Sequence, residues 1–301
     1  RGNVRALKPI PKGNRMQPAR AGALAALAAF VSWGVFGIYF KALAAVPAAE
    51  VLTHRILGGA LFALLVQAAW GKLGEIRAAF ADRRVLAGLA GSALAIAVNW
   101  GLYIWAVAIG HALEASLGYF IFPLVSVLLA RLLLGERLSR RQGVAVGLAS
   151  LGVAWLVVGG HGMPWIALVL AASFGTYGLL RKTIAVPALA GLFVEALLLT
   201  PAALAYLIWH DGGVVMAGID ATTLALIAVA GPLTTVPLAL FAFGARRLPL
   251  STLGVMMYVN PSVQMLVAVF VFGETFTPTH AIAFGAIWCG LALYSWPRRW
   301  T

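Results

Sequence analysis

Long apolar stretches, separated by short polar connections, run along almost the whole chain. A helix needs about 20 mostly apolar residues to cross the hydrocarbon core of a bilayer. Ten stretches approach or exceed that length and predict ten transmembrane helices, at residues 22–44, 48–70, 85–108, 112–134, 142–159, 164–182, 188–209, 221–244, 250–272 and 278–297. Residues 1–20 are polar and basic and contain several prolines, so we expect a disordered segment there. The pattern therefore predicts an all-α integral membrane protein.

The composition excludes the soluble classes of protein. The 301 residues are 62% hydrophobic and 10% charged, with a mean hydropathy of +0.95. Soluble domains carry about 25% charged residues, and intrinsic disorder requires low hydrophobicity. The net charge of +13 does not indicate nucleic-acid binding, because the basic residues occur in small groups between the apolar stretches. We expect the lipid bilayer, and no nucleic acid, as a partner.

The placement of Lys and Arg predicts the orientation of the chain. With a cytoplasmic N-terminus, 19 of the 22 basic residues fall in cytoplasmic segments. The opposite connections hold none, unless Lys41 at the end of the first stretch is counted. Because Lys and Arg accumulate on the cytoplasmic side, we expect both termini inside and an even number of spans. The expected location is the bacterial inner membrane.

The chain contains an internal repeat. Ser32–Lys41 and Ser173–Lys182 share a serine, two glycines and a lysine at a constant offset of 141. The sequence Val-Pro-Ala precedes the second and seventh stretches, and Gly-Glu follows the fourth and ninth. These matches predict two repeats of five spans each, at residues 21–159 and 160–301. An odd number of spans inverts the second repeat, an arrangement typical of secondary transporters that bind substrate near the membrane midplane.

Several segments resemble one known family. They are Thr53–Arg55, Asn99–Val107, Gly110–Ile121, Pro164–Lys182 and Gly231–Leu238, together with the repeat and the Gly-Glu motifs. The chain resembles the EamA family of the drug/metabolite transporter superfamily, and its RarD branch in particular. The resemblance implies a proton- or gradient-driven carrier, usually an exporter, of small metabolites, amino-acid-like compounds or drugs. One departure is Phe122 before Pro123, where asparagine would be expected, as in Asn260-Pro261.

Other functions receive less support from the sequence. An exchanger of anionic or nucleotide-linked metabolites is the alternative within transport, and Arg55 would suit it. An intramembrane enzyme is disfavoured because no paired catalytic residues converge, and a channel because no filter-like segment repeats. The loop histidines lie in four separate loops without chelating spacing, so neither a metal nor a cofactor is expected. The substrate, the direction of transport and the choice between monomer and homodimer remain open.

Two ionisable residues are predicted to lie near the membrane midplane. Arg55 and Glu195 each follow their Val-Pro proline by eight residues, which is about 12 Å along a helix. Such groups are costly in a bilayer and are therefore functional candidates. Their equivalent positions in the two repeats predict an ion pair in a central cavity, with a fixed structural salt bridge as the alternative. His54, the neighbour of Arg55, is a weaker candidate for coupling.

Further candidates flank this pair. Asn99 and Tyr103 share one helix face and are predicted to line the cavity, although an interfacial aromatic girdle would explain them too. Glu114 follows His111 at the start of the fourth span and is a candidate gate or proton site, with simple stabilisation by the helix dipole as the alternative. Mid-span kinks at Pro123 and Pro261 make these two prolines candidates for gating. The kinks would expose a partly polar aromatic binding surface, for which ordinary packing is the alternative; its residues are Tyr119, Phe122, Tyr258 and Asn260.

Overall fold

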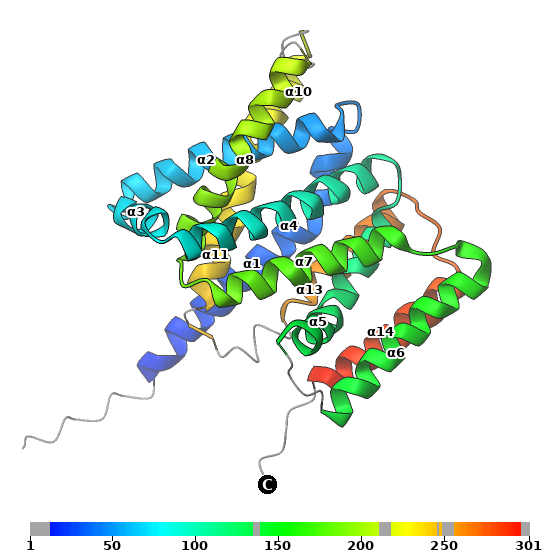
Figure 1. The fold of residues 1–301 in the computed structure, drawn as a ribbon. Helices are drawn as coiled ribbons and strands as arrows, with labels where there is room; N and C mark the ends of the chain where they lie inside the picture. The colour runs from blue at the N-terminus through cyan, green and yellow to red at the C-terminus, as the bar shows by residue number, and fades with distance from the viewer. Residues whose placement is uncertain (1–12, 135–138, 211–217, 246, 249–255, 296–301) are drawn as a thin grey trace, which may run out of the picture.

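The chain folds into a bundle of helices (Figure 1). The computed structural model describes residues 13–134, 139–210, 218–245, 247–248 and 256–295, and within these ranges it contains no strand. The helices are α1 (Gly13–Ala42), α2 (Ala48–Ala69), α3 (Leu73–Ala81), α4 (Arg83–Ala108), α5 (Ala112–Leu134), α6 (Arg140–Leu156), η1 (Val157–His161), α7 (Trp165–Thr183), α8 (Ala188–Trp209), α10 (Ala221–Ala228), α11 (Ala230–Ala245), α13 (Val259–Leu266), η2 (Val267–Val271) and α14 (Pro278–Ser295).

The helices and their surfaces are those of a membrane protein. Six helical segments of the described chain are long and apolar enough to cross a bilayer, namely α1, α2, α4, α6 with η1, α8, and α10 with α11. Shorter apolar helices occur in α5, α7, α13 with η2, and α14. Large apolar side chains also cover the outside, for example Val158 at 81% and Phe270 at 79% exposure. Soluble monomers rarely expose so much apolar surface, whereas a bilayer solvates it.

The helices follow the predicted stretches, with four differences. α1 begins at Gly13, inside the segment expected to be disordered. The short helix α3 was not expected; it buries Ile76 and Ala79. The eighth stretch breaks into α10 and α11 at Val229. The ninth stretch ends in the π-helical turn η2.

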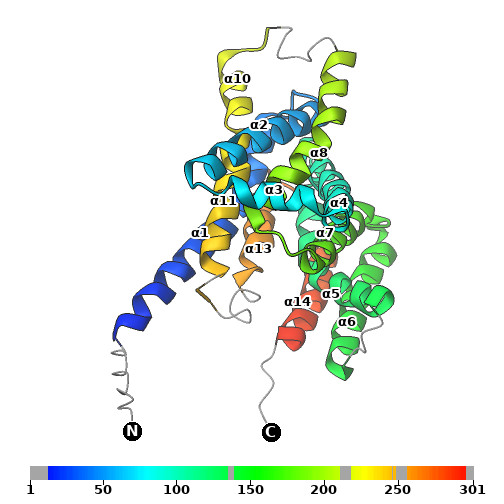
Figure 2. The same cartoon turned by 60° about the vertical axis from the view of Figure 1, so that its left-hand side comes forward.

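The packing pattern is symmetric between the two proposed repeats. α4 and α5 of the first repeat pack on α7, and in the same way α11 and α13 of the second repeat pack on α1. Three further contacts join corresponding helices directly, namely α2 with α8, α5 with α13, and α6 with α14. Figures 1 and 2 show the α6–α14 pair at one side of the bundle and the α1–α11 pair at the other. Exchanging the repeats thus exchanges equivalent contacts.

Glycines allow the closest helix contacts. A Cβ atom on Gly231 of α11 would overlap the backbone of Gly58 in α2. α6 and α14 use a reciprocal pair, in which Gly152 faces Ala283 and Gly290 faces Ala145. Such small residues let transmembrane helices approach closely, where van der Waals contact provides much of the association energy.

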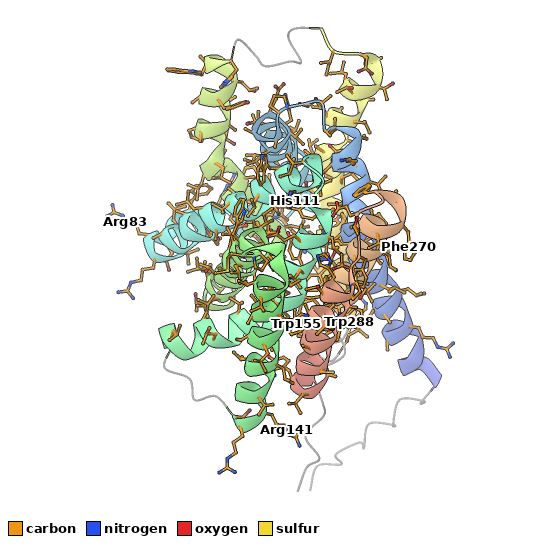
Figure 3. All side chains as sticks on the ribbon, turned by 90° about the vertical axis from the view of Figure 1, so that its right-hand side faces the viewer. Arg83, His111, Arg141, Trp155, Phe270 and Trp288 are labelled. Atoms are coloured by element: carbon orange, nitrogen blue, oxygen red, sulfur yellow. The ribbon has the colours of Figure 1, made fainter. Side chains whose placement is uncertain are left out.

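The described start of α1 and the described end of α14 lie at the same end of the bundle in both views (Figures 1 and 2). Arg83, at the start of α4, and Arg141, near the start of α6, extend away from the ribbon (Figure 3). Basic side chains at helix starts that point outward suit contact with water and lipid headgroups.

Candidate functional site

Arg55 lies inside a cage of aromatic rings. Its guanidinium carbon is 4.0 Å from the ring centroid of Trp100 on α4, and 5.4 Å and 5.9 Å from those of Phe40 and Phe36 on α1. Its Nε donates a hydrogen bond of 3.0 Å to the hydroxyl of Thr234 on α11. The ring faces attract the cation, and Arg55 is only 6% exposed. We call these five residues the Arg55 cluster.

Glu195 on α8 has a cluster of its own. Its Oε1 accepts a 2.5 Å hydrogen bond from the Ser92 hydroxyl on α4 and lies 3.7 Å from Nη1 of Arg181 on α7. The Tyr177 side chain lies beside both charged groups. The guanidinium of Arg181 rests on Gly191, where a Cβ atom would overlap it. Glu195, Ser92, Arg181 and Tyr177 form the Glu195 cluster.

The two clusters are built from equivalent positions of the two repeats. Each has a buried charge hydrogen-bonded to a hydroxyl from one helix, with two side chains from another helix against it. The equivalent pairs, separated by 140, 141, 141 and 142 positions, are Arg55 with Glu195, Phe36 with Tyr177, Phe40 with Arg181, and Ser92 with Thr234. The repeat therefore extends from sequence into side-chain contacts.

The expected ion pair between Arg55 and Glu195 does not form in this structure. Within the described residues, the cation paired with Glu195 is Arg181, and Arg55 has no carboxylate within 4.0 Å. The reason is local, since Gly191 leaves space for Arg181 one helical turn from Glu195. Sequence reasoning missed Arg181, Ser92 and Thr234, although the offset of about 141 positions contained the signal.

Asn99 and Tyr119 lie in a second polar contact. The amide nitrogen of Asn99 donates to the carbonyl of Leu170 (3.0 Å) and to the hydroxyl of Ser173 (3.2 Å) on α7. Its carbonyl oxygen accepts a 2.7 Å hydrogen bond from the Tyr119 hydroxyl on α5. Asn99 is 1% exposed. It therefore joins α4, α5 and α7, and it is too deeply buried for an interfacial girdle.

Aromatic rings connect this contact with both clusters. Tyr103 has its ring centroid 5.9 Å from that of Phe40 and 5.7 Å from that of Tyr119. Phe174 continues the series, with centroids 5.7 Å from Tyr119 and 5.9 Å from Tyr177. Phe122 packs edge-on against Phe174 at 4.9 Å. Four predicted residues, Asn99, Tyr103, Tyr119 and Phe122, thus gather in one region.

The remaining predicted residues of the aromatic surface lie on α5 and α13. Pro123 lies inside α5, as expected. Pro261 is in the first turn of α13 rather than at mid-helix, where proline is tolerated because its missing N–H has no intrahelical partner. The Asn260 side chain accepts a 3.0 Å hydrogen bond from Gln264 in the same helix. Tyr258 packs against the main apolar core.

His54 faces a carboxylate one turn earlier in α2. Its Nε2 lies 3.7 Å from Oε1 of Glu50, a side chain that is 2% exposed. His54 is therefore directed away from the Arg55 cluster contacts and toward the start of α2. Among the described residues, no hydrogen bond or ion pair joins His54 to Glu195, and its charged neighbour is Glu50.

Two glutamates hold helix starts at the end of the bundle where α4 turns into α5. Glu274 accepts hydrogen bonds from the backbone N–H groups of Ala112 (2.8 Å) and Leu113 (2.7 Å), at the start of α5. Glu114 accepts one of 2.9 Å from Ile166, at the start of α7. The first N–H groups of a helix lack intrahelical partners, so these carboxylates connect the two repeats. Gly135 and Glu136 lie outside the described residues.

These glutamates line a cavity of about 340 Å³. His111 and His280 also border it, and the His111 ring lies 3.4 Å from the second oxygen of Glu114. Burial raises the pKa of Glu274 above the usual range for glutamic acid, although its two backbone hydrogen bonds oppose the shift. No group of three or more potential metal ligands occurs among the residues with described positions.

Replacing Glu274 with glutamine should lower the free energy of unfolding by about 1–2 kcal/mol, the usual cost of losing a helix cap. The effect should depend on pH. A carboxyl whose folded-state pKa is raised contributes its stability fully below the unfolded pKa and loses it as the pH rises through the folded pKa. The advantage of the wild type over Glu274→Gln should therefore shrink with rising pH. Thermal unfolding in detergent at several pH values measures this difference.

Glu75→Gln is the matched control, because among the described residues the Glu75 carboxylate on α3 has an ion pair only with Lys72, at 4.0 Å and partly exposed. Surface ion pairs contribute little, so this variant should track the wild type at every pH. If the stability difference between Glu274→Gln and the wild type grows with rising pH, burial does not raise the pKa of Glu274.

Comparisons with known proteins agree with this architecture. Residues 20–158 match the EamA-like transporter family. The chain is 45% identical over 278 residues to an uncharacterized transporter of Pseudomonas aeruginosa, covering 92% of this chain and 93% of that protein. It is 42% identical over 277 residues to protein RarD of Escherichia coli, covering 91% and 94%. A crystal structure with 21% identity and a TM-score of 0.58 covers 90% of this chain and 96% of that one, which supports the fold.

These findings define the class of protein: a multi-pass helical membrane protein of a transporter family. The chain belongs to the EamA-like transporter family of the drug/metabolite transporter superfamily. Its similarity to proteins named RarD places it in the RarD-like branch. A further relative, 34% identical over 283 residues, is named chloramphenicol-sensitive protein RarD in Pseudomonas aeruginosa. Transporter names among the relatives agree with the expectation that the chain is not an enzyme.

Proposed function

We propose that the protein is a secondary active transporter that moves a small organic molecule across the bacterial inner membrane by alternating access. The observation that supports it most is the repetition of one buried charge cluster in both halves of the chain. In transporters with inverted repeats, the substrate site lies where the two halves meet. Access to it alternates between the two sides of the membrane as one half rocks against the other. The proposed topology has ten spans in two inverted repeats, at residues 21–159 and 160–301.

The orientation and the coupling are part of the same proposal. Nineteen of 22 basic residues lie on one side of the proposed ten-span topology, which favours cytoplasmic termini. Transport is proposed to be coupled to protons. The group proposed to carry the exchangeable proton is Glu195, because it is a carboxylate buried among the spans. Export is the proposed direction. Asn99, Tyr103, Tyr119 and Phe122 are proposed to line the substrate path because they join the two clusters.

Purified protein in proteoliposomes tests the proposal. A labelled panel of amino acids, organic acids, amines and drug-like compounds is offered with and without an imposed pH gradient. We expect saturable movement of at least one compound, accelerated by the gradient and abolished by a protonophore. Glu195→Gln should keep substrate exchange but lose the acceleration, because the glutamine side chain cannot carry the proton.

Liposomes without protein provide the background, and imposing the pH gradient in both senses reads the direction. Flux that rises linearly with concentration without saturation would indicate a channel. Absence of any protein-dependent movement across the panel would contradict the transporter proposal itself.

A further inference from the structure

The Arg55 guanidinium lacks a negative partner inside the described protein. Its Nε donates to Thr234, but its two terminal nitrogens donate to no residue whose position is described. Arg55 is only 6% exposed. Isolated charges are costly in a low-dielectric interior, and attraction to ring faces compensates only a small part of that cost.

The Glu195 cluster shows what a completed cluster contains. There, the buried charge has a hydroxyl partner, Ser92, and an opposite charge, Arg181. In the Arg55 cluster the hydroxyl is present as Thr234, but the position equivalent to Arg181 is Phe40. The Glu195 cluster therefore holds a carboxyl group and a guanidinium together, whereas the Arg55 cluster holds a guanidinium alone.

The surroundings of Arg55 also limit the shape of an anion that could pair with it. Trp100, Phe36 and Phe40 present rings to the guanidinium, so aromatic surface from α1 and α4 borders it. Tyr103 and Tyr119 extend the aromatic wall from Phe40 toward α5. A ligand here needs a compact oxyanion at one end and an apolar body at the other.

We infer that the Arg55 cluster binds the carboxylate of a small organic anion with an apolar or aromatic body, and that such anions are the substrate class. The inference rests on the proposed transport function. The two terminal nitrogens of an arginine match the two oxygens of a carboxylate. The ligand thereby supplies the charge that Arg181 supplies in the other repeat. An amine of the same shape is repelled, and a neutral amide leaves the cation uncompensated.

Ligand-dependent thermal unfolding of the full chain in detergent tests the charge preference directly. The probes are phenylacetate, phenylacetamide and phenethylamine, which share a ring and differ in charge. We expect a saturable rise in unfolding temperature with phenylacetate, and apparent affinities for the other two weaker on the order of 30-fold or more, the usual result of leaving a buried charge unpaired.

Three variants locate the effect. Arg55→Gln should abolish the preference for the anion, and Arg55→Lys should retain it with lower affinity because lysine cannot bind bidentately. Phe40→Glu supplies an internal anion at the position equivalent to Arg181, so it should block phenylacetate binding in a folded protein even if Arg55→Gln does not fold. Arg83→Gln is the control, since Arg83 points away from the bundle (Figure 3), and its affinities should equal those of the wild type.

Equal shifts for the three probes, no shift with phenylacetate, or an anion preference that survives in Arg55→Gln would each overturn the inference. Its failure is separable from that of the transport proposal. Saturable proteoliposome transport restricted to amines or neutral compounds would refute the anion and leave the transporter standing.

Discussion

Replacing Arg181 with glutamine should lower the free energy of unfolding by about 3–5 kcal/mol, because the substitution leaves the Glu195 carboxylate buried without its cation. Glu195 is only 1% exposed. Glu195→Gln should cost less, since the Arg181 side chain is 15% exposed and can turn toward solvent. The double variant should be more stable than Arg181→Gln alone, because it removes the orphaned charge.

Thermal unfolding of wild type, both single variants and the double variant forms a double-mutant cycle that isolates the pair. Arg141→Gln is the control, because Arg141 extends away from the ribbon of α6 (Figure 3) and should change stability by no more than about 0.5 kcal/mol. If the losses of the two single variants simply add in the double variant, Arg181 and Glu195 do not stabilise each other.

Gly231→Ala should destabilise the protein by about 3 kcal/mol, at the upper end of the usual cost of overpacking. The new Cβ atom would overlap the Gly58 backbone, so α11 and α2 must separate. Backbone cannot move aside as a flexible side chain can. Thr234 lies one turn further along α11, and its hydrogen bond to Arg55 should lengthen as the helices part. Unfolding temperature and phenylacetate affinity should therefore fall together.

Gly147→Ala controls for the loss of glycine itself. Gly147 is in α6 with open space around its Cβ position, and alanine is the better helix former by about 1 kcal/mol. This variant should equal or exceed the wild type in stability. A Gly231→Ala protein as stable as the wild type would mean that α2 and α11 do not depend on this contact.

The helix order was accessible from sequence because each stretch long enough to span a bilayer forms helix in its described part. The length of an apolar stretch does not predict where a helix breaks or begins within it. The break at Val229 and the start of α13 two residues before Pro261 depend on neighbouring helices, which a count of apolar residues does not include.

The sequence singled out Arg55 and Glu195 but not the partners of either residue. Both are buried, and they lie in separate clusters rather than as the expected pair. The pairing of Glu195 with Arg181 depends on the space that Gly191 leaves for the Arg181 guanidinium. The repeat marks Phe40 and Arg181 as equivalent, yet only the contacts show that one position stacks on a cation and the other neutralises an anion.

The difference between Phe40 and Arg181 also bears on the energies of the transport cycle. In the proposed transport cycle, two identical inverted halves would make the inward-facing and outward-facing states equivalent by a two-fold rotation, and equivalent states have equal free energy in a symmetric environment. Here, one half holds a completed charge pair and the other an unmatched cation. This difference in charge would make the two states of the proposed cycle differ in free energy, so their populations would be biased toward one face of the membrane. An anion bound at Arg55 would make the halves electrostatically more alike and reduce that bias, which is a thermodynamic means for cargo to release the resting state.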